Sequence, residues 1–245
     1  MHKAVLFDLD GTLVDSSEGV LNAAKETFAA LGIVAPTDDD IRSCIGPPIG
    51  ESLGEMLGFS DSKKKEFYGV FRRLYKDKFV FQCSPYPGIL PLLQELGGKG
   101  CLIGIATNKR RDSTEALLQH IGMSELFDVV IAQDRDSIRD KSNMILDALE
   151  ALHVGKGESV MVGDSLSDLN ATKDAGVEFI GVRYGFGLKE PVEGIKLVDT
   201  VDDLRSSLLN RLLRVEMSDN LLYPVRERGF RDEPGVRCKL RDVGT

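Results

Sequence analysis

The segment "VLFDLDGTLVDSS" (residues 5–17) passes from an apolar run directly into two carboxylates and a glycine. Short apolar runs of this kind are typical of strands that are buried on both faces. Asp8 and Asp10 share one side of such a strand if it continues, because successive side chains point to opposite faces. Gly11 then permits a sharp turn. Since two like charges in one cleft repel each other, either one carboxylate takes up a proton or a cation holds both.

Four further apolar runs follow the first, and helical patterns lie between them. They are "CLIGIAT" (101–107), "FDVVIA" (127–132), "SVMVGD" (159–164) and "EFIGVR" (178–183). Parallel strands need crossover connections, and strands that alternate with helices provide them. The sequence therefore predicts an α/β protein with a doubly wound, Rossmann-like parallel sheet.

Between the first two predicted strands, three amphipathic helical segments interrupt the alternation. The stretch "CSPYPG" (83–88), with two prolines and a glycine, closes this tract as a stiff linker. We expect an inserted all-helical domain at 16–84, while residues 1–15 and 85–214 form the α/β core. Residues 215–245 mix charged residues with prolines and glycines. The sequence does not assign a role to this C-terminal extension.

The balance of charges limits the partners of this chain. Its 31 Lys and Arg residues face 39 Asp and Glu residues, which gives a formal net charge of -8. This charge argues against a sequence-independent grip on nucleic acid or on an anionic membrane. No apolar segment approaches the roughly 20 residues of a membrane helix. The four cysteines lack metal-site spacing, so we expect reduced thiols in a cytoplasmic protein that binds neither nucleic acid nor a membrane.

The predicted carboxyl ends of the other strands also carry polar residues, and ligands of doubly wound sheets collect at this edge. They are Thr107 and Asn108 after the second strand, Lys141 after the third, and Asp164 with Asp168 after the fourth. A hard cation such as Mg²⁺ prefers carboxylates, waters and a substrate phosphate, while a hydroxyl and a lysine can hold phosphoryl oxygens. Each residue alone also fits a turn, a helix cap or a solvated side chain. Their joint placement favours a site.

These four stations, in this order, resemble the motifs of the haloacid dehalogenase superfamily. "DLDGT" matches the first motif, "ATN" the second, Lys141 the third and "GDSLSD" the fourth, over about residues 1–214. The resemblance implies that Asp8 is the nucleophile that accepts a phosphoryl group and that Asp10 is the general acid and then base. It implies phosphoryl-binding roles for Thr107, Asn108 and Lys141.

The resemblance also implies a bound Mg²⁺ ion. Its ligands would be the carboxylates of Asp8 and Asp164 and the backbone carbonyl of Asp10, with Asp168 in a supporting role. Covalent catalysis fits the residue types, because a carboxylate nucleophile divides one difficult hydrolysis into two easier steps. The metal and a lysine would neutralise charge in each step.

Within the superfamily, an acid at position 10 points to phosphate esters or anhydrides, since an oxygen leaving group benefits from a proton donor. The helical insertion resembles the family's cap, which closes over the site and excludes water. The chain looks most like phosphoglycolate phosphatases, whose cap contacts the substrate through a loop at the place of "CIGPPIGESL" (44–53). Arg42, Gly46 and Pro47 are the candidate substrate contacts there, although the segment also fits a plain connection between helices.

Three local features keep two readings each. Ser142 replaces the proline that often follows the third-motif lysine, and it can cap the helix that begins there. The basic residues 109–111 fit either a solvated loop or a rim above an anionic substrate. The stretch "GFGLKEP" (185–191) resembles a glycine-rich loop of these phosphatases, but it equally fits a simple turn.

The leading hypothesis is a Mg²⁺-dependent phosphatase that hydrolyses a small phosphorylated metabolite, phosphoglycolate-like, through an aspartyl phosphate. Alternatives within the superfamily are a phosphosugar mutase, which shares every core residue, and a pyrophosphatase or nucleotidase. An alternative that is not an enzyme is a protein that binds a phospho-ligand without turnover. The C-terminal extension without an assigned role keeps this alternative open. The sequence leaves monomer and homodimer equally open.

Overall fold

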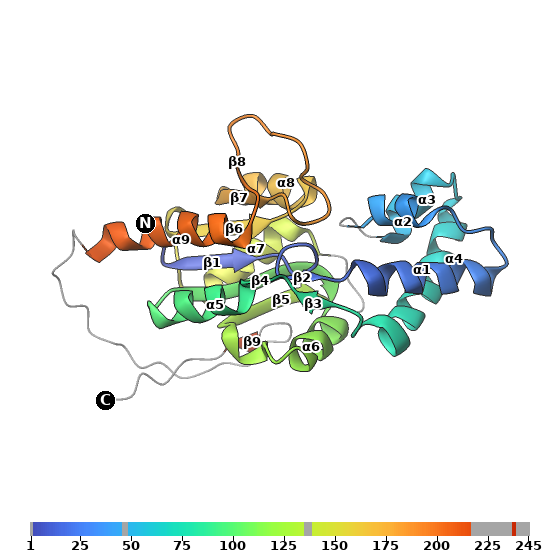
Figure 1. The fold of residues 1–245 in the computed structure, drawn as a ribbon, viewed down its shortest axis with the longest axis horizontal. Coiled ribbons are helices and arrows are strands. Elements are labelled where there is room, and N and C mark those ends of the chain that lie inside the picture. The colour runs from blue at the N-terminus through green and yellow to red at the C-terminus, as the bar shows by residue number, and fades with distance from the viewer. Residues whose placement is uncertain (1, 46–48, 135–138, 217–236, 239–245) are drawn as a thin grey trace.

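The computed structural model describes residues 2–45, 49–134, 139–216 and 237–238, with side chains as far as Asn210. Its main sheet has seven strands in the order β8-β7-β6-β1-β4-β5-β9 (Figure 1). The strands are β1 (Ala4–Phe7), β4 (Leu102–Arg110), β5 (Val129–Gln133), β6 (Ser159–Gly163), β7 (Glu178–Val182), β8 (Lys196–Val198) and β9 (Arg237–Cys238). The first six in chain order are mutually parallel, and β9 is antiparallel to β5. The predicted α/β fold with a doubly wound parallel sheet is confirmed.

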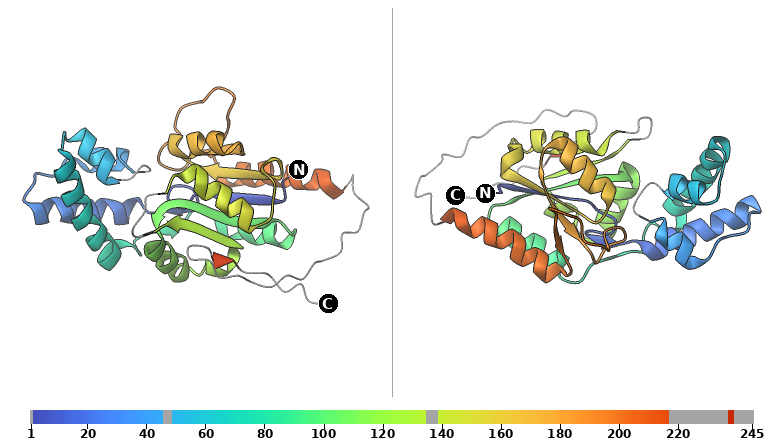
Figure 2. Two further views of the ribbon diagram at one scale, coloured as in Figure 1. Left: turned by 180° about the vertical axis from the view of Figure 1, so that it is seen from behind. Right: turned by 90° about the horizontal axis from the view of Figure 1, so that it is seen from above.

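Helices cover both faces of the sheet, as Figure 2 shows from two directions. Val5 and Phe7 of β1 point to one face and Leu6 to the other, because side chains of a strand alternate. The first face packs against α5 (Ile89–Gly98), α6 (Arg111–His120) and α9 (Val201–Glu216). The second packs against α7 (Lys141–Ala151) and α8 (Leu166–Ala175). Two short 3₁₀ turns, η2 (Ser124–Leu126) and η3 (Lys156–Glu158), complete the core connections.

The strand order reverses at β1, which lies between β4 and β6. From β1 the chain reaches β4 and β5 on one side, and then crosses back to β6, β7 and β8 on the other. Loops that leave the carboxyl ends of neighbouring strands therefore diverge above β1, and the crevice between them is where a doubly wound sheet binds its ligand. Asp8 is the first residue after β1, so it lies at this point.

The helical insertion leaves and rejoins the core through two short strands. β2 (Val14–Asp15) and β3 (Ser84–Pro85) pair antiparallel, so the outgoing and returning chains are held side by side. Between them lie α1 (Ser17–Leu31), α2 (Asp38–Ser43), α3 (Ile49–Met56), α4 (Asp61–Leu74) and the π-helical turn η1 (Tyr75–Phe79). These helices bury their own apolar faces, with the rings of Phe28 and Phe67 4.9 Å apart. Among the described residues between β2 and β3, the chain forms no strand.

Of the C-terminal extension, the structure describes residues 215–216 and 237–238. The last helix continues to Glu216, two residues beyond the expected core boundary, and residues 237–238 add an antiparallel edge to β5. Cys44, Cys83 and Cys101 are free thiols. Across the described segments, every helix is too short or too polar to cross a membrane.

Candidate active site

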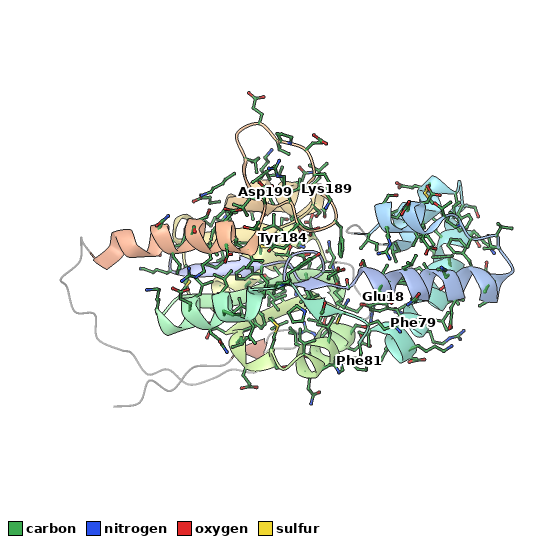
Figure 3. The ribbon with its side chains drawn as sticks, in the orientation of Figure 1. Glu18, Phe79, Phe81, Tyr184, Lys189 and Asp199 are labelled. Atoms are coloured by element: carbon green, nitrogen blue, oxygen red, sulfur yellow. The ribbon has the colours of Figure 1, made fainter. Side chains whose placement is uncertain are left out.

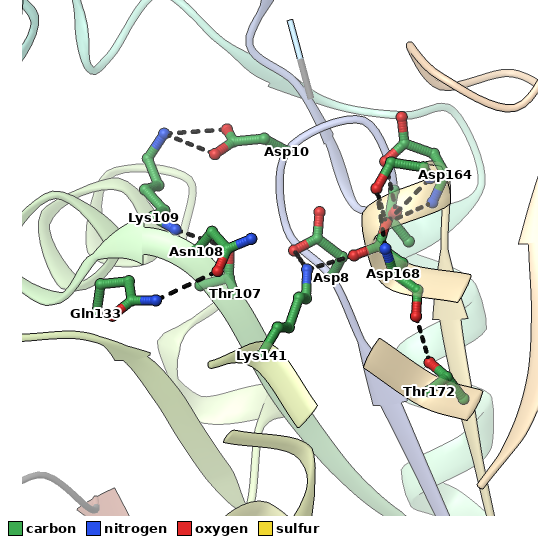
Figure 4. Close-up of polar contacts among 12 residues, drawn as sticks. Asp8, Asp10, Thr107, Asn108, Lys109, Gln133, Lys141, Asp164, Asp168 and Thr172 are labelled. Carbon is green, nitrogen blue, oxygen red and sulfur yellow. Dashed lines mark hydrogen bonds and ion pairs between the residues drawn. The ribbon is translucent and has the colours of Figure 1, made fainter. Parts of the chain in front are cut away.

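The side chain of Asp8 lies against Lys141 at the tip of β1. The Nζ atom of Lys141 donates to Oδ1 of Asp8 at 2.6 Å and also pairs with Oδ1 of Asp168 (Figure 4). Lys141 is the first residue of α7, whose N-cap is Asp140: its carboxylate accepts from the backbone N–H of Ser142 at 2.9 Å. The expectation that Ser142 itself caps the helix is therefore wrong, because Asp140, two residues earlier, is the N-cap and accepts the free N–H of Ser142. Starting the helix at Lys141 aims its side chain at the sheet edge.

Asp164 follows β6 and is almost completely buried, at 1% exposed. Its Oδ2 accepts hydrogen bonds from the backbone N–H groups of Phe186 at 2.6 Å and Gly187 at 3.3 Å, and its Oδ1 accepts from Thr12 Oγ1 at 3.4 Å. Tyr184 lies on the same loop, which carries Lys189 a few residues later (Figure 3). The stretch 185–191 is thus more than a turn, since its backbone holds an acid of the site.

Asp168, in the first turn of α8, organises the loop that carries Asp164. Its Oδ2 accepts from the backbone N–H groups of Asp164 at 3.1 Å and Ser165 at 3.0 Å, and from Ser165 Oγ at 2.7 Å. Ser165 in turn caps α8, so the two residues form a capping box. Asp168 therefore connects the loop geometry of Asp164 to the lysine that contacts Asp8.

Asp8, Asp164 and Asp168 form a buried group of carboxylates, with one oxygen from each lying within 4.8 Å of the others. Burial raises the pKa of Asp8 to about 6, with Lys141 opposing and Asp168 adding to the rise. Burial, together with the charges of Asp168 and Asp8, raises the pKa of Asp164 to about 7. Oxygen ligands whose negative charges are costly in each other's presence fit a hard divalent cation. The expected metal ligands were the carboxylates of Asp8 and Asp164 and the backbone carbonyl of Asp10. The carboxylate of Asp168, which was expected only in a supporting role, also belongs to this group.

The carboxylate of Asp10 points to a lysine on the far side of Asp8 from Asp164 (Figure 4). Lys109 Nζ lies 3.0 Å from both carboxylate oxygens of Asp10 and donates to the hydroxyl of Tyr75 at 2.7 Å. Burial opposes the charge of Lys109, but Asp10 and Tyr75 outweigh it and raise the pKa of the lysine. The side chain of Lys109 is 7% exposed, so the solvated-loop reading is wrong at this position. Sequence reasoning missed Lys109 as a partner of Asp10, and it missed Tyr75 altogether.

Thr107 and Asn108 lie near the end of β4, which pairs directly with β1. The hydroxyl of Thr107 is buried and accepts from the backbone N–H of Lys109 at 3.2 Å. The side-chain oxygen of Asn108 accepts from Gln133 Nε2 at 3.3 Å. Thr107 is thus at the crevice as expected, and Asn108 is held toward β5 in this structure.

A pocket of about 140 Å³ opens between the insertion and the core, next to Asp10. It is lined by Asp10, Ser16, Val20, Ile45, Ile49, Tyr68, Phe71, Arg72, Tyr75, Asn108, Lys109, Arg110 and Ser113. Of the expected cap contacts, Arg42 is exposed on α2 and is not part of this lining. Gly46 and Pro47 lie outside the described residues. The arginines that line the pocket are instead Arg72 of α4 and Arg110 at the end of β4.

Comparison with known proteins places this arrangement in a family. The chain is 31% identical to a phosphoglycolate phosphatase of Rhodospirillum rubrum, over 84% of this chain and 89% of the relative. It is 29% identical to a 5'-nucleotidase of Pseudomonas aeruginosa, over 76% of this chain and 85% of the relative. The crystal structure of a predicted phosphatase from Clostridium acetobutylicum superposes with a TM-score of 0.80 at 29% identity, covering 86% of this chain and 99% of that one. A sequence model of the haloacid dehalogenase-like hydrolases matches residues 5–182, so this chain belongs to that family.

Proposed function

We propose that the protein is a Mg²⁺-dependent phosphatase that hydrolyses a small phosphorylated metabolite, phosphoglycolate-like, through an aspartyl phosphate on Asp8. The observation that carries the proposal is the buried contact of Lys141 with Asp8, beside Asp164 and Asp168 at one edge of the sheet. The names of the relatives in Rhodospirillum rubrum and Pseudomonas aeruginosa support a phosphate-ester substrate. The small volume of the pocket next to Asp10 supports a small leaving group.

In the first step, an oxygen of Asp8 attacks phosphorus while the bond to the leaving oxygen breaks, and Asp10 gives that oxygen a proton. In the second step, Asp10 takes a proton from water as the water oxygen attacks phosphorus. The bond to Asp8 then breaks, which releases phosphate and restores the carboxylate. Each proton that Asp10 gives is thereby replaced in the same turnover.

Lys141 and Thr107 bind phosphoryl oxygens, and Lys141 also balances the charge of Asp8 throughout. Mg²⁺ would be held by the carboxylates of Asp8 and Asp164 and the carbonyl of Asp10, and it would supply positive charge that offsets the negative phosphoryl oxygens. Asp168 orients Lys141 and the Asp164 loop without contacting the substrate. Asn108 is proposed as a further phosphoryl contact.

The assignment of these functions to separate domains is also a proposal. Residues 1–15 and 85–214 act as the catalytic core, and residues 16–84 act as a cap that covers the pocket and excludes bulk water. Arg42 remains a candidate substrate contact if the cap changes its position when substrate binds. Residues 215–245 are an extension outside this division.

The proposal is tested by phosphate release from 4-nitrophenyl phosphate, with and without Mg²⁺, in the wild type and in Asp8→Asn. We expect release that needs Mg²⁺ and is abolished in Asp8→Asn, together with a hydroxylamine-trapped adduct on residue 8 of the wild type. Asp38→Asn, an exposed acid that pairs with Lys25 at the surface, is the matched control and should retain activity. Undiminished release by Asp8→Asn would contradict the proposed nucleophile.

The substrate is assigned by comparing kcat/KM for phosphoglycolate, pyrophosphate, nucleoside monophosphates and a hexose 1-phosphate. The proposal expects the highest value for phosphoglycolate. A preference for pyrophosphate or a nucleotide would move the protein to the corresponding branch of the family. Isomerised sugar in place of free phosphate would identify a mutase, and ligand binding without turnover would identify a non-catalytic protein.

A further inference from the structure

We propose that Lys109, held by Tyr75 of the helical insertion, is a positioning residue for Asp10. In this role it fixes the carboxylate that takes the proton from water when the aspartyl phosphate is hydrolysed. The inference rests on the proposed function and adds to it a link between the position of the insertion and one of the two chemical steps.

The contact between Lys109 and Asp10 constrains the carboxylate more than a single hydrogen bond does. Both oxygens of Asp10 lie 3.0 Å from the same Nζ atom, so rotation about the last bond of the aspartate would break at least one contact. The lysine side chain is 7% exposed and the aspartate side chain 24% exposed. A charge pair this sheltered from water is screened less than a surface pair.

The other partner of Lys109 comes from the insertion, whereas Lys109 itself lies on core strand β4. The hydroxyl of Tyr75 accepts from Nζ at 2.7 Å, and the ammonium lies 4.6 Å from the centre of the Tyr75 ring. One tyrosine thus offers the lysine both a hydrogen-bond acceptor and an aromatic face. Asp10, Lys109 and Tyr75 all line the pocket between the two parts of the chain.

Packing within the insertion fixes the position of Tyr75. It begins the π-helical turn η1, and its ring stacks on Phe71 of α4 with centroids 5.7 Å apart and planes 12° apart. The ring is nearly completely buried. Single π-helical turns are frequent at functional sites, because the extra residue re-aims the side chains that follow. A shift of the insertion would therefore carry Tyr75 with it and change the support that Lys109 receives.

The two steps of the reaction depend to different degrees on where the Asp10 carboxylate points. To accept a proton, an oxygen of Asp10 must face the attacking water, and the contact of both oxygens with Lys109 Nζ fixes their direction. If Lys109 orients this base, its removal slows hydrolysis of the aspartyl phosphate. It leaves phosphoryl transfer from a substrate with a good leaving group almost unchanged, because such a leaving group needs no proton.

The test separates the two steps by rapid-quench, single-turnover measurements with 4-nitrophenyl phosphate and Mg²⁺. In Lys109→Met we expect the rate constant for hydrolysis of the phosphoenzyme to fall by about 10-fold or more, as for a misplaced general base. Formation of the phosphoenzyme should change less than about threefold. Tyr75→Phe should show the same pattern with a smaller loss. Lys78→Met, which removes an exposed lysine of the same π-helical turn, is the control and should change neither step.

A double-mutant cycle shows whether Lys109 acts through Asp10. If it does, Lys109→Met lowers the hydrolysis step in the wild type but causes no further loss in Asp10→Asn. Equal losses in both steps, no loss in either, or an additive loss in Asp10→Asn would each overturn the positioning role. The proposed function fails in a different way: the wild type itself would then form no phosphoenzyme and release no phosphate, and the role of Lys109 would fall with it.

Discussion

The Nζ atom of Lys141 lies 2.6 Å from Oδ1 of Asp8, although the two residues are 133 positions apart in the chain. Both side chains are nearly buried, at 5% and 11% exposed. The same ammonium pairs with Asp168, so one lysine balances two buried carboxylates. Because an unpaired charge in such a place is costly, the stability of this edge of the sheet and its chemistry depend on the same side chain.

Replacing Lys141 with methionine should therefore impair both activity and stability. Removing one partner of a buried ion pair costs about 3–5 kcal/mol of unfolding free energy, and losing one donor to the phosphoryl group costs about 100-fold or more in kcat. Urea denaturation at about pH 5 should show a smaller loss of stability than at about pH 8, because the abandoned carboxylates can take up protons.

The exposed lysine of α8 provides the control for this variant. Lys173→Met should retain both activity and stability. A loss of stability in Lys141→Met that is the same at both pH values would contradict the account based on unpaired charge.

The stability of the metal-free protein should fall as the pH rises from about 4 through about 7. Burial raises the pKa of Asp8 from 3.8 to about 6 and that of Asp164 from 3.8 to about 7. Since both folded-state values exceed the unfolded ones, these acids stabilise the folded protein fully below about pH 4 and lose that contribution as they ionise.

Mg²⁺ should reverse this loss, because it competes with protons for the same oxygens. We expect Mg²⁺ to raise Tm clearly at about pH 8 and little at about pH 5, with roughly 2–4 °C for each kcal/mol of binding. Thermal unfolding with and without Mg²⁺ at the two pH values is the measurement. An equal rise at both would mean that the ion binds elsewhere, and Asp164→Asn should remove the rise at the higher pH.

The meeting of Asp8, Lys141, Asp164 and Asp168 could be predicted because it follows from the topology. Each residue comes at or shortly after the carboxyl end of a strand, and parallel strands bring those ends to one edge. Strand positions are visible in the sequence as apolar runs, so Asp8 and Lys141, which are 133 positions apart, could be assigned to one site. The four motifs of the sequence thus lie at or after the ends of four strands, β1, β4, β5 and β6.

The rest of the site depends on features that residue types do not signal. Phe186 and Gly187 hold Asp164 through backbone N–H groups, which every residue except proline has. Tyr75 contacts Lys109 only because the insertion packs in one orientation on the core, and the periodicity of a helix does not give that orientation. Lys109 had a weak signal, since it directly follows Asn108 at the end of a strand.

Asp168→Asn should lower the affinity for Mg²⁺ even though Asp168 is proposed to act through its neighbours. It accepts hydrogen bonds from the backbone of Asp164 and from Ser165, and it pairs with Lys141. Losing such a supporting partner typically costs about 10–100-fold in metal affinity or activity. Titration of activity with Mg²⁺ measures the change, and Asp174→Asn, an exposed acid of the same helix, should leave the titration unaltered. An unchanged Mg²⁺ requirement in Asp168→Asn would contradict this role.

Gly185→Ala should disable the site by displacing Asp164. A Cβ atom at position 185 would meet the carbonyl oxygen of Gly11 and the side chain of Asp164, and the first of these is backbone that cannot move aside cheaply. Overpacking of this kind costs about 1–3 kcal/mol, and a shifted metal ligand lowers metal affinity further. Gly98→Ala is the matched control, because a Cβ there meets nothing within 4 Å. We expect Gly185→Ala to need more Mg²⁺ for activity and to unfold at a lower temperature, while Gly98→Ala keeps wild-type behaviour in both measurements. If Gly185→Ala retains the wild-type Mg²⁺ titration, the loop after β7 does not hold Asp164 during turnover, and the backbone contacts of Phe186 and Gly187 have no part in metal binding.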